Sequence, residues 1–402
     1  MSTARTADFL IVGGGVIGLT IGLELKRRRP DAAVTLIEKE DACGMHASGR
    51  NSGVLHAGFY YTADSLKARF TKAGNRAWSA YCEARGLRIN RCGKLVVARS
   101  AQELAGLDEL SRRARANGVE LAALTADEAR RIEPRVRTHE RALFSPTTAS
   151  VDPAELIAAL TTDALALGLT IRTATAYRGT TRGAVRTSAG RFAAGYVINA
   201  AGLYADRIAR DYGFGERYRI LPFRGLYLHG NGGSRPPRTH VYPVPDLGQP
   251  FLGVHFTVTV TGHATIGPTA IPAFWREHYG GMANFDPREC AEILACEAGL
   301  LLSNEGDFRS LAWSEVRKYS RRRLVRLAAE LVEGTEPAAY RRWGPAGIRA
   351  QLFDRQTRRL EMDFRYEGDD RSFHVLNAVS PGFTCALPFA AHVTDCIERL
   401  RA

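Results

Sequence analysis

The sequence lacks any Cys-x-x-Cys pair, and its seven cysteines are an odd number. A zinc module and a disulfide framework are therefore both disfavoured, and a reducing, cytoplasmic location is expected. The first eight residues are polar and too short for a secretory signal. One apolar stretch, Phe9–Leu25, has the length of a membrane span, but it contains five glycines and is better explained by their spacing.

Lysine is scarce, because only six of the 55 basic residues are lysines and the rest are arginines. Against 42 acidic residues, the formal net charge is +13. A positive field of this size favours anionic ligands. The basic residues form no recognisable nucleic-acid-binding motif, so we expect a small anionic substrate and no nucleic acid. The 402 residues, 45% of them hydrophobic, are sufficient for two globular domains.

A glycine-rich turn between an apolar strand and a helix is the first sign of a nucleotide site. Phe9–Val12 is a short apolar run typical of a buried parallel strand. Gly13, Gly15 and Gly18 follow with the spacing G-x-G-x-x-G, and helical periodicity continues to Arg29. In this pattern the first glycine permits the tight turn, and the second lets the backbone approach a pyrophosphate. The third lets the helix and the strand pack closely.

A second predicted strand, Val34–Ile37, is followed by the acidic residue Glu38, which lies 20 residues after Gly18. A carboxylate at this position accepts hydrogen bonds from a ribose 2′-hydroxyl, and its charge disfavours the 2′-phosphate of NADP. The unit therefore predicts a dinucleotide site but leaves NAD and FAD both open.

Two later segments favour FAD. Residues 39–58 are rich in Gly, Ser and Asn, which predicts an irregular loop whose N–H groups can follow a pyrophosphate and a ring system. Arg50 in this loop is suited to binding a phosphate. The run Gly195–Gly202 predicts a strand that ends in small residues, past which a nucleotide can lie closely. Such a late strand, combined with an N-terminal nucleotide unit, is typical of flavoproteins with a discontinuous FAD domain.

Longer motifs give the chain a more specific resemblance. Ser48–Tyr61 and Ser65–Lys67 resemble the L-2-hydroxyglutarate oxidase/dehydrogenase family, which belongs to the wider D-amino-acid-oxidase-like group of FAD enzymes. Further matches follow in order along nearly the whole chain. They are Cys92–Leu95, Pro222–Gly225, Tyr242–Asp246, Pro250–Thr257, Gly267–Pro268, Pro345–Gln351, Asn377 and Ser380–Pro381.

The resemblance implies an α/β fold, with a discontinuous Rossmann-like FAD-binding domain and an α+β antiparallel-sheet substrate domain. The predicted FAD-binding domain comprises residues 1–90, 140–218 and 340–402, and the predicted substrate-binding domain comprises residues 91–139 and 219–339. Alternating apolar runs such as Phe251–Val260 favour the antiparallel sheet. Helices are predicted over Ala101–Gly118, Thr125–Ile132, Ala154–Leu167, Trp313–Val332 and Pro388–Leu400.

We expect four segments to hold FAD: the glycine turn, the loop after it, the late strand, and the start of the last helix. Backbone N–H groups at a helix start stabilise negative charge. The predicted residues are Gly13, Gly15, Gly18, Glu38, Lys39, Ser48, Arg50, Asn51, Ser52, Gly53, Ala201, Gly202, Gly382, Phe383 and Thr384. Cys385 follows, as a buried free thiol or, alternatively, as a point of covalent flavin attachment. No metal is expected.

The implied reaction is oxidation of L-2-hydroxyglutarate to 2-oxoglutarate, with hydride transfer to flavin N5. A base must take the hydroxyl proton while the C2 hydride leaves, and histidine is well suited to this role. We predict that His255 is this base. The resemblance places the motif of His56 near the flavin ring, so His56 is predicted as a flavin-side or shared proton group. For each histidine, a hydrogen-bonded structural role is the alternative.

The substrate carboxylates require cations, and the planar guanidinium of arginine matches a carboxylate. Arg349 is the first choice because it lies within the Pro345–Gln351 motif. The other predicted substrate-binding residues are Arg276, Arg224, Lys67, Tyr60, Tyr61 and Tyr242.

Other functions stay open because Leu226 and Phe383–Cys385 depart from the usual family sequence. One alternative is oxidation of an amine, an amino acid or a modified 2-hydroxy acid; another is a flavin-binding protein used for interaction or regulation. The electron acceptor is oxygen, a quinone or a carrier protein. The basic segment Trp313–Val332 is predicted to be a solvated face, with peripheral contact to an anionic membrane as the alternative.

Overall fold

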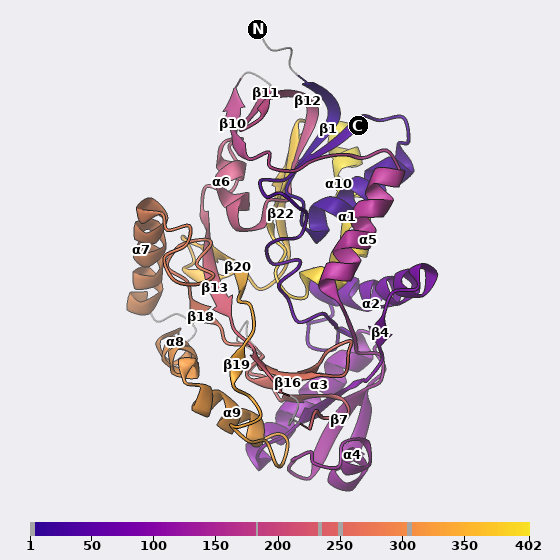
Figure 1. Ribbon diagram of the computed structural model, residues 1–402, viewed down its shortest axis with the longest axis vertical. Helices are drawn as coiled ribbons and strands as arrows, with labels where there is room; N and C mark the ends of the chain where they lie inside the picture. The colour runs from indigo at the N-terminus through magenta and orange to yellow at the C-terminus, as the bar shows by residue number, and fades with distance from the viewer. Residues whose placement is uncertain (1–4, 182–183, 232–234, 248–251, 304–307) are drawn as a thin grey trace. The chain divides into compact units, whose positions relative to one another are not determined.

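The computed structural model describes residues 5–181, 184–231, 235–247, 252–303 and 308–402. The chain folds into two units, each assembled from segments that are distant in sequence (Figure 1). Unit 1 comprises Met1–Asn51, Pro153–Leu221 and Arg349–Ala402, and unit 2 comprises Ser52–Asp152 and Pro222–Ile348.

Unit 1 contains a mainly parallel sheet. Its strands are β1 (Arg5–Val12), β2 (Val34–Ile37), β9 (Thr170–Arg172), β10 (Tyr177–Thr181), β11 (Ala184–Thr187), β12 (Gly190–Asn199), β22 (Arg365–Gly368) and β23 (Ser372–Asn377). β1 pairs in parallel with β2 on one side and with β12 on the other, and β12 also pairs with β23. Every residue of β2 is buried, as expected for a strand covered on both faces. The predicted strands at Phe9–Val12 and Val34–Ile37 are confirmed.

Three helices of unit 1 pack together: α1 (Val16–Arg28), α5 (Pro153–Ala166) and α10 (Gly382–Arg401). Thr20 Oγ1 in α1 donates to Ala386 O in α10 at 3.3 Å. The apolar stretch Phe9–Leu25 is therefore divided into a strand, a turn and a helix. A further helix, α6 (Ala205–Arg210), contacts β23.

Unit 2 contains a sheet in which most neighbouring strands are antiparallel. In order across the sheet, the strands are β19 (Arg342–Trp343), β14 (Leu228–His229), β17 (Ala264–Gly267), β16 (His255–Val258), β15 (His240–Pro243), β5 (Lys94–Val97), β7 (Arg141–Ser145) and β6 (Ala122–Thr125). The pair β15 and β5 is parallel, and it joins the strands β19, β14, β17, β16 and β15 to the strands β5, β7 and β6. β16 occupies part of the predicted strand Phe251–Val260, and residue 251 lies outside the described residues.

Helices cover both faces of this sheet. α3 (Leu104–Ala116) packs its leucines against Val96, whereas α9 (Arg321–Ala329) packs against Leu95 and Val97. The alternation along β5 is that of a strand whose successive side chains point to opposite faces. The remaining helices of unit 2 are α2 (Leu66–Arg85), α4 (Ala126–Ile132), α7 (Pro287–Ser303) and α8 (Phe308–Val316). The predicted helix Trp313–Val332 is thus interrupted, since Ser320 is the N-cap of α9.

The unit boundaries differ from the predicted domain boundaries. Residues 52–90 and 140–152 belong to unit 2 rather than to the unit of the glycine turn. The physical reason is a three-stranded sheet in which β8 (Ala149–Val151) pairs with β3 (Val54–Leu55) and β4 (Ile89–Asn90). These long-range pairings hold both segments in unit 2.

Strands β13 (Tyr218–Gly225) and β20 (Gly347–Asp354) carry the chain from one unit to the other, in a sheet with β18 (Ile271–Pro272) and β21 (Arg359–Leu360). Among the described residues, no helix has both the length and the apolar character needed to cross a membrane.

Candidate active site

The glycine turn between β1 and α1 is shaped by close backbone approaches. Gly13 has a φ of 111°, and a Cβ there would lie 2.5 Å from Ala200 O, so the position requires glycine. A Cβ on Gly18 would lie 2.0 Å from Gly13 O. The start of α1 is therefore held tightly against the turn. Because Ala200 directly follows β12, the end of the late strand also lies beside the turn.

The N-terminus of α1 has features of an anion-binding site. Its first turn carries no acidic side chain, and Gly15 at the N-cap supplies no side-chain acceptor. The Val16 N–H donates to Ser48 Oγ at 2.9 Å. A Cβ on Gly15 would lie 3.0 Å from the same Ser48 oxygen, so a side chain there would narrow the space beside the helix start. The helix dipole and the free N–H groups fit a pyrophosphate.

Glu38 is fixed at the end of β2 by backbone donors. Its carboxylate accepts hydrogen bonds from Gly14 N at 2.6 Å and from Glu40 N at 2.9 Å. The side chain is buried, and one lone pair on each oxygen is left for another donor. This geometry suits the ribose hydroxyls of a dinucleotide, as the sequence predicts.

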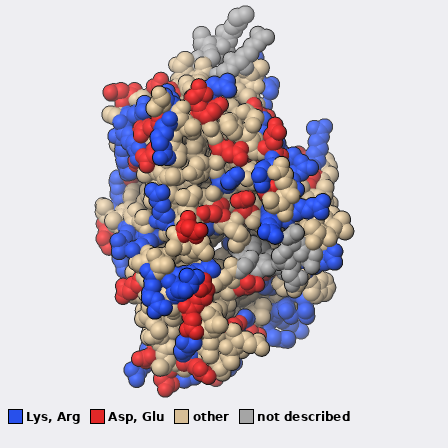
Figure 2. All heavy atoms as spheres, turned by 180° about the vertical axis from the view of Figure 1, so that it is seen from behind, with Lys and Arg blue, Asp and Glu red and all other residues tan. Residues whose placement is uncertain are grey.

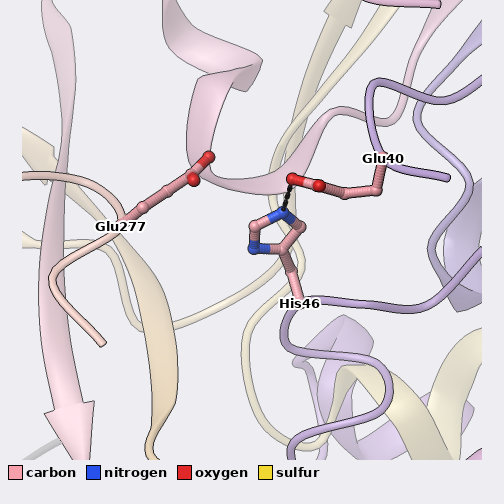
Figure 3. A group of neighbouring side chains, drawn as sticks. All are labelled: Glu40, His46 and Glu277. Carbon is pink, nitrogen blue, oxygen red and sulfur yellow. Dashed lines mark hydrogen bonds and ion pairs between the residues drawn. The ribbon is translucent and has the colours of Figure 1, made fainter. Parts of the chain in front are cut away.

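The loop after Glu38 is irregular, as expected, and several of its polar side chains are engaged within unit 1. The Lys39 ammonium pairs with Glu40, which also contacts His46 at 2.9 Å between Oε1 and Nε2 (Figure 3). The Lys39 ammonium, followed by the His46 contact, lowers the pKa of Glu40 below its usual value despite partial burial. Arg50 Nε donates to a backbone carbonyl at 2.8 Å, and Asn51 Nδ2 donates to Ser48 O at 2.7 Å. The last two interactions brace the loop that carries Ser48.

The other predicted cofactor residues fall in three places. Ala201 and Gly202 follow β12, and Gly382–Thr384 form the first turn of α10, which carries no acidic side chain. Ser52 and Gly53 belong to unit 2, so the predicted cofactor residues are divided between the two units.

In unit 2, four predicted site residues lie around one buried lysine. The Tyr242 ring stacks on the His255 ring, with centroids 3.6 Å apart and an interplanar angle of 16°. Lys94 Nζ lies 4.2 Å from the Tyr242 ring centroid and 5.1 Å from that of Tyr60. It is also 3.4 Å from Nδ1 of His56. All five side chains are buried.

Strand alternation explains this convergence. Lys94, Tyr242 and His255 come from three adjacent strands, β5, β15 and β16. Their immediate neighbours along the strands belong to one hydrophobic cluster, packed against α9: Leu95, Val241 and Phe256. Because side chains alternate along a strand, the polar residues point to the opposite face.

The hydrogen bond of His255 fixes the tautomer in which Nε2 is unprotonated and can act as a base. Its Nδ1 lies 2.9 Å from the Gly253 carbonyl, which only accepts hydrogen bonds, so Nδ1 carries the proton in the neutral ring. Nε2 then has a free lone pair. Burial, followed by the Lys94 charge, lowers the pKa of His255 well below its usual value, so the ring is neutral before substrate binds.

Comparison with known proteins places these features in a family. The family model described as FAD dependent oxidoreductase (DAO) matches residues 8–396. This chain belongs to the DAO family. It is similar to the L-2-hydroxyglutarate dehydrogenase of Escherichia coli strain K12, with 35% identity over 98% of this chain and 94% of that protein. It is also similar to the mitochondrial L-2-hydroxyglutarate dehydrogenase of Homo sapiens, with 32% identity over 99% of this chain and 90% of that protein.

Solved structures show the same fold at lower identity. L-alpha-glycerophosphate oxidase from Mycoplasma pneumoniae has a TM-score of 0.78 and 23% identity, covering 98% of this chain and 95% of its own. Glycine oxidase from Geobacillus kaustophilus has a TM-score of 0.73 and 22% identity, covering 99% and 96%. The predicted α/β FAD-binding fold is thereby confirmed, and FAD is the cofactor of this DAO-family oxidoreductase.

The predicted substrate cations of this DAO-family chain have different surroundings. Arg276 is buried and lies 3.9 Å from both Glu289 and Glu292, which favours a structural ion-pair role. Arg224 on β13 donates to the Tyr319 hydroxyl, and burial lowers its pKa.

Two further predicted cations, Arg349 and Lys67, belong to different units. Arg349 lies on β20 in unit 1 and is half-buried. Lys67 on α2 lies 5.9 Å from the ring centroid of Tyr61. Within unit 2, the clearest candidate for proton-transfer chemistry is therefore the histidine cluster rather than these cations.

Lys94 is the central residue of the cluster, and the sequence analysis did not select it as a site residue. One signal was present: Lys94 opens the apolar strand Lys94–Val97, and lysine is rarely buried without a partner. The alternation pattern gave it the same face as Val96, which packs in the core.

Proposed function

We propose that this chain oxidises L-2-hydroxyglutarate to 2-oxoglutarate. The observation that supports this proposal most strongly is the similarity over 98% of the chain to a protein named L-2-hydroxyglutarate dehydrogenase. The buried histidine cluster supplies the proton chemistry that such an oxidation needs.

His255 is the proposed base. Its Nε2 lone pair takes the hydroxyl proton of the substrate, while the Gly253 carbonyl holds the opposite side of the ring at 2.9 Å. Bound FAD supplies the two-electron acceptor for the C2 hydride at its flavin N5. The stacked Tyr242 ring fixes the plane of the imidazole, so Nε2 keeps one direction. The proton that leaves the hydroxyl therefore ends on His255.

The proposed FAD-binding residues are those predicted from the sequence. The strongest support comes from the glycine turn, from Ser48 at the start of α1 and from Glu38 at the end of β2, whose geometry fits a dinucleotide. For the two carboxylates of the substrate we propose Arg349 first, followed by Lys67 and Arg224. Arg276 is the least suitable of these cations because two carboxylates already accompany it.

Anaerobic flavin reduction tests the proposal. Purified protein should be yellow, and L-2-hydroxyglutarate should bleach the flavin absorbance with production of 2-oxoglutarate. The D-enantiomer and a panel of amines and amino acids serve as controls. Bleaching by an amine or amino acid alone would replace the proposal with the amine-oxidase alternative. A yellow protein that no hydroxy acid or amine reduces would instead favour a flavin-binding regulatory protein.

A second measurement identifies the electron acceptor. Reoxidation of the reduced enzyme by oxygen, by a soluble quinone and by an electron-carrier protein can be followed separately in a stopped-flow instrument. We propose that a quinone or a carrier protein accepts the electrons, because the similar proteins are named dehydrogenases. Oxygen reoxidation as fast as turnover would contradict this.

A further inference from the structure

Lys94 is a buried basic residue that has no acidic partner among the described residues. Its exposure is 0%, and no carboxylate oxygen of these residues lies within 4.0 Å of its Nζ. Its one hydrogen-bond contact with them is to His56 Nδ1, at 3.4 Å. An ammonium group has three N–H donors, so this contact leaves most of its hydrogen-bonding capacity unused. Burial of such a charge is costly unless an opposite charge accompanies it.

Two other buried lysines show how this chain usually accommodates a buried ammonium group. The Lys318 ammonium pairs with the Glu315 carboxylate, and Lys26 Nζ donates to two backbone carbonyls. Lys94 has neither kind of partner among the described residues, and its other neighbours there are aromatic rings. A ring face attracts a cation, but more weakly than a carboxylate does in a site without water. A bound anion would therefore complete the surroundings of Lys94.

A second polar group without a partner lies beside Lys94. The Tyr60 hydroxyl is buried, and it has no hydrogen-bond partner among the described residues. The centroid of the Tyr60 ring is 5.1 Å from Lys94 Nζ. A buried hydroxyl without a hydrogen bond destabilises the site that contains it. Because a carboxylate has two oxygens that accept hydrogen bonds, one carboxylate group can serve both an ammonium and a phenol donor.

The position of Lys94 relative to the proposed base indicates which carboxylate it meets. Lys94 stands on β5 and His255 on β16, with β15 between them, so their backbones are about 10 Å apart. The Tyr242 ring fills the interval, since its centroid is 3.6 Å from that of His255 and 4.2 Å from Lys94 Nζ. A carboxylate on the hydroxyl carbon stays beside the base. The far carboxylate of a five-carbon diacid is three carbon–carbon bonds away, which suits the position of Lys94.

We propose that Lys94 and the Tyr60 hydroxyl bind the distal carboxylate of the substrate, and thereby select dicarboxylic over monocarboxylic 2-hydroxy acids. This inference rests on the proposed function and deepens it, because it names the residues that determine the substrate class. The carboxylate next to the hydroxyl carbon is left to the cations proposed above, of which Arg349 is the first. The burial of Lys94 is in keeping with this role, since the proposed base His255 is buried as well.

The surroundings of Lys94 also connect carboxylate binding to pH. Burial lowers the pKa of Lys94 to about 7, with Cys92 acting in the opposite direction. A carboxylate bound beside the ammonium group raises this pKa again. Burial keeps the facing tyrosines protonated and the facing strand histidines neutral. The titratable groups that face Lys94 are His56 and Tyr60 from the segment between β3 and α2, His240 and Tyr242 from β15, His255 from β16, and Cys92 before β5.

Two substrates that differ only at the distal carboxylate test the proposal. L-2-hydroxyvalerate has a methyl group where L-2-hydroxyglutarate has this carboxylate. The second-order rate constant of anaerobic flavin reduction is measured for both acids with the wild-type holoenzyme and with Lys94→Met. Because the variant loses the charge but keeps a side chain of similar length, its rate constant for the diacid should fall about 10²-fold or more. The rate constant for the monoacid should change less than about threefold, because that substrate has no group for Lys94 to bind.

Two further variants separate this role from a structural one. Tyr60→Phe removes the hydroxyl but keeps the ring, and it should reduce the preference for the diacid by about 3- to 10-fold. Lys26→Met removes a buried lysine of unit 1 and should leave the preference unchanged. An equal loss of rate with both acids in Lys94→Met would show that Lys94 is merely structural, and it would overturn the proposal. An unchanged rate with the diacid would overturn it as well.

Binding of glutarate, a diacid that lacks the hydroxyl group, gives a readout without turnover. Titration of the oxidised holoenzyme, followed by the flavin absorbance and by calorimetry, gives its dissociation constant. Above about pH 7, glutarate binding to the wild type should weaken by up to about tenfold per pH unit, as free Lys94 loses its proton. In Lys94→Met, binding should be weaker by about 10²-fold at pH 6.5 and should lose this pH dependence.

The binding measurement also separates the two proposals. If L-2-hydroxyglutarate fails to reduce the flavin while glutarate binding depends on Lys94, the proposed function fails and the carboxylate site stands. If the flavin is reduced but glutarate binds equally well to the wild type and to Lys94→Met, the proposed function stands and this inference fails. A wild-type holoenzyme that does not bind glutarate at all would also overturn the inference.

Discussion

At the scale of single residues, His255 is the side chain whose loss should separate chemistry from folding and cofactor binding. His255→Ala removes the proposed base but leaves the glycine turn of unit 1 intact. We expect the purified variant to keep its yellow colour and to reduce its flavin about 10²–10⁴-fold more slowly. His263→Ala, at an exposed histidine of the same β16–β17 hairpin, is the control. A near-normal rate in His255→Ala removes the residue from this role.

Glu297 provides a residue-scale prediction about stability. It lies in α7, and among the described residues its buried Oε1 has no hydrogen-bond partner. Burial raises the pKa of Glu297 from 4.5 to about 7. The folded state thus binds this proton more tightly than the unfolded state, so the free energy of unfolding falls as the pH rises from 4.5 to about 7. Glu297→Gln should raise the free energy of unfolding at pH 8 by about 2–3 kcal/mol and change it little at pH 4.

Urea unfolding of the two proteins at both pH values measures this difference. Glu120→Gln replaces an exposed glutamate and should show no gain at either pH. Equal stability of Glu297→Gln and the wild type at pH 8 would mean that the buried carboxylate finds a partner or water there.

At the scale of elements, the turn between β1 and α1 should separate cofactor binding from folding. Gly15 has a φ of −76°, which any residue can adopt, and its closest neighbour is the flexible Ser48 hydroxyl. The Gly15→Val variant should therefore fold, but its valine side chain should occupy the space beside the N-terminus of α1, where the pyrophosphate is proposed to bind. We expect a colourless protein with normal circular dichroism that does not bind added FAD. Full flavin content in this variant would contradict the nucleotide site.

Gly18→Ala gives the opposite expectation within the same turn. Its Cβ would lie 2.0 Å from the Gly13 carbonyl oxygen, a backbone atom that cannot move away without displacing the strand. We expect a lower melting temperature as well as loss of FAD. Gly299→Ala in α7 is the matched control and should retain FAD, because no atom of the described residues lies within 4 Å of the new Cβ.

The same elements show what sequence could and could not predict. The β1–α1–β2 unit was predictable because glycine spacing and apolar runs are local signals. The cluster around Lys94 was not, because its members come from a loop and from strands that are distant in sequence. In particular, the parallel pairing of β5 with β15 aligns Val96 with Tyr242, and no local pattern encodes that register. The sequence selected His255 and His56 as separate candidates, and the structure places both in one cluster with Lys94, which became visible only with the pairing.

At the scale of the whole molecule, both units are assembled from discontinuous segments, so each depends on pairings between distant parts of the chain. The first and last segments of unit 1 meet where α1 packs on α10. The predicted domains and these units differ over segments 52–90 and 140–152 for the same reason, since β3, β4 and β8 pair across long stretches of sequence. Domain boundaries in such a chain follow strand pairing rather than sequence order.

The net charge of +13 leads to a last prediction. Basic and acidic side chains are interspersed on the face shown in Figure 2, and the net positive charge of the whole chain gives a positive field. Such a field raises the encounter rate of a dianionic hydroxy acid and is screened by salt, with a Debye length of about 10 Å at 0.1 M. Between about 20 and about 300 mM NaCl, we expect kcat/KM to fall roughly 3- to 10-fold. Because saturation removes the encounter step, kcat should change much less.

Potassium acetate at equal ionic strength should give the same slope. A fall specific to chloride would indicate competition at an anion site, and a flat kcat/KM would exclude steering by the field.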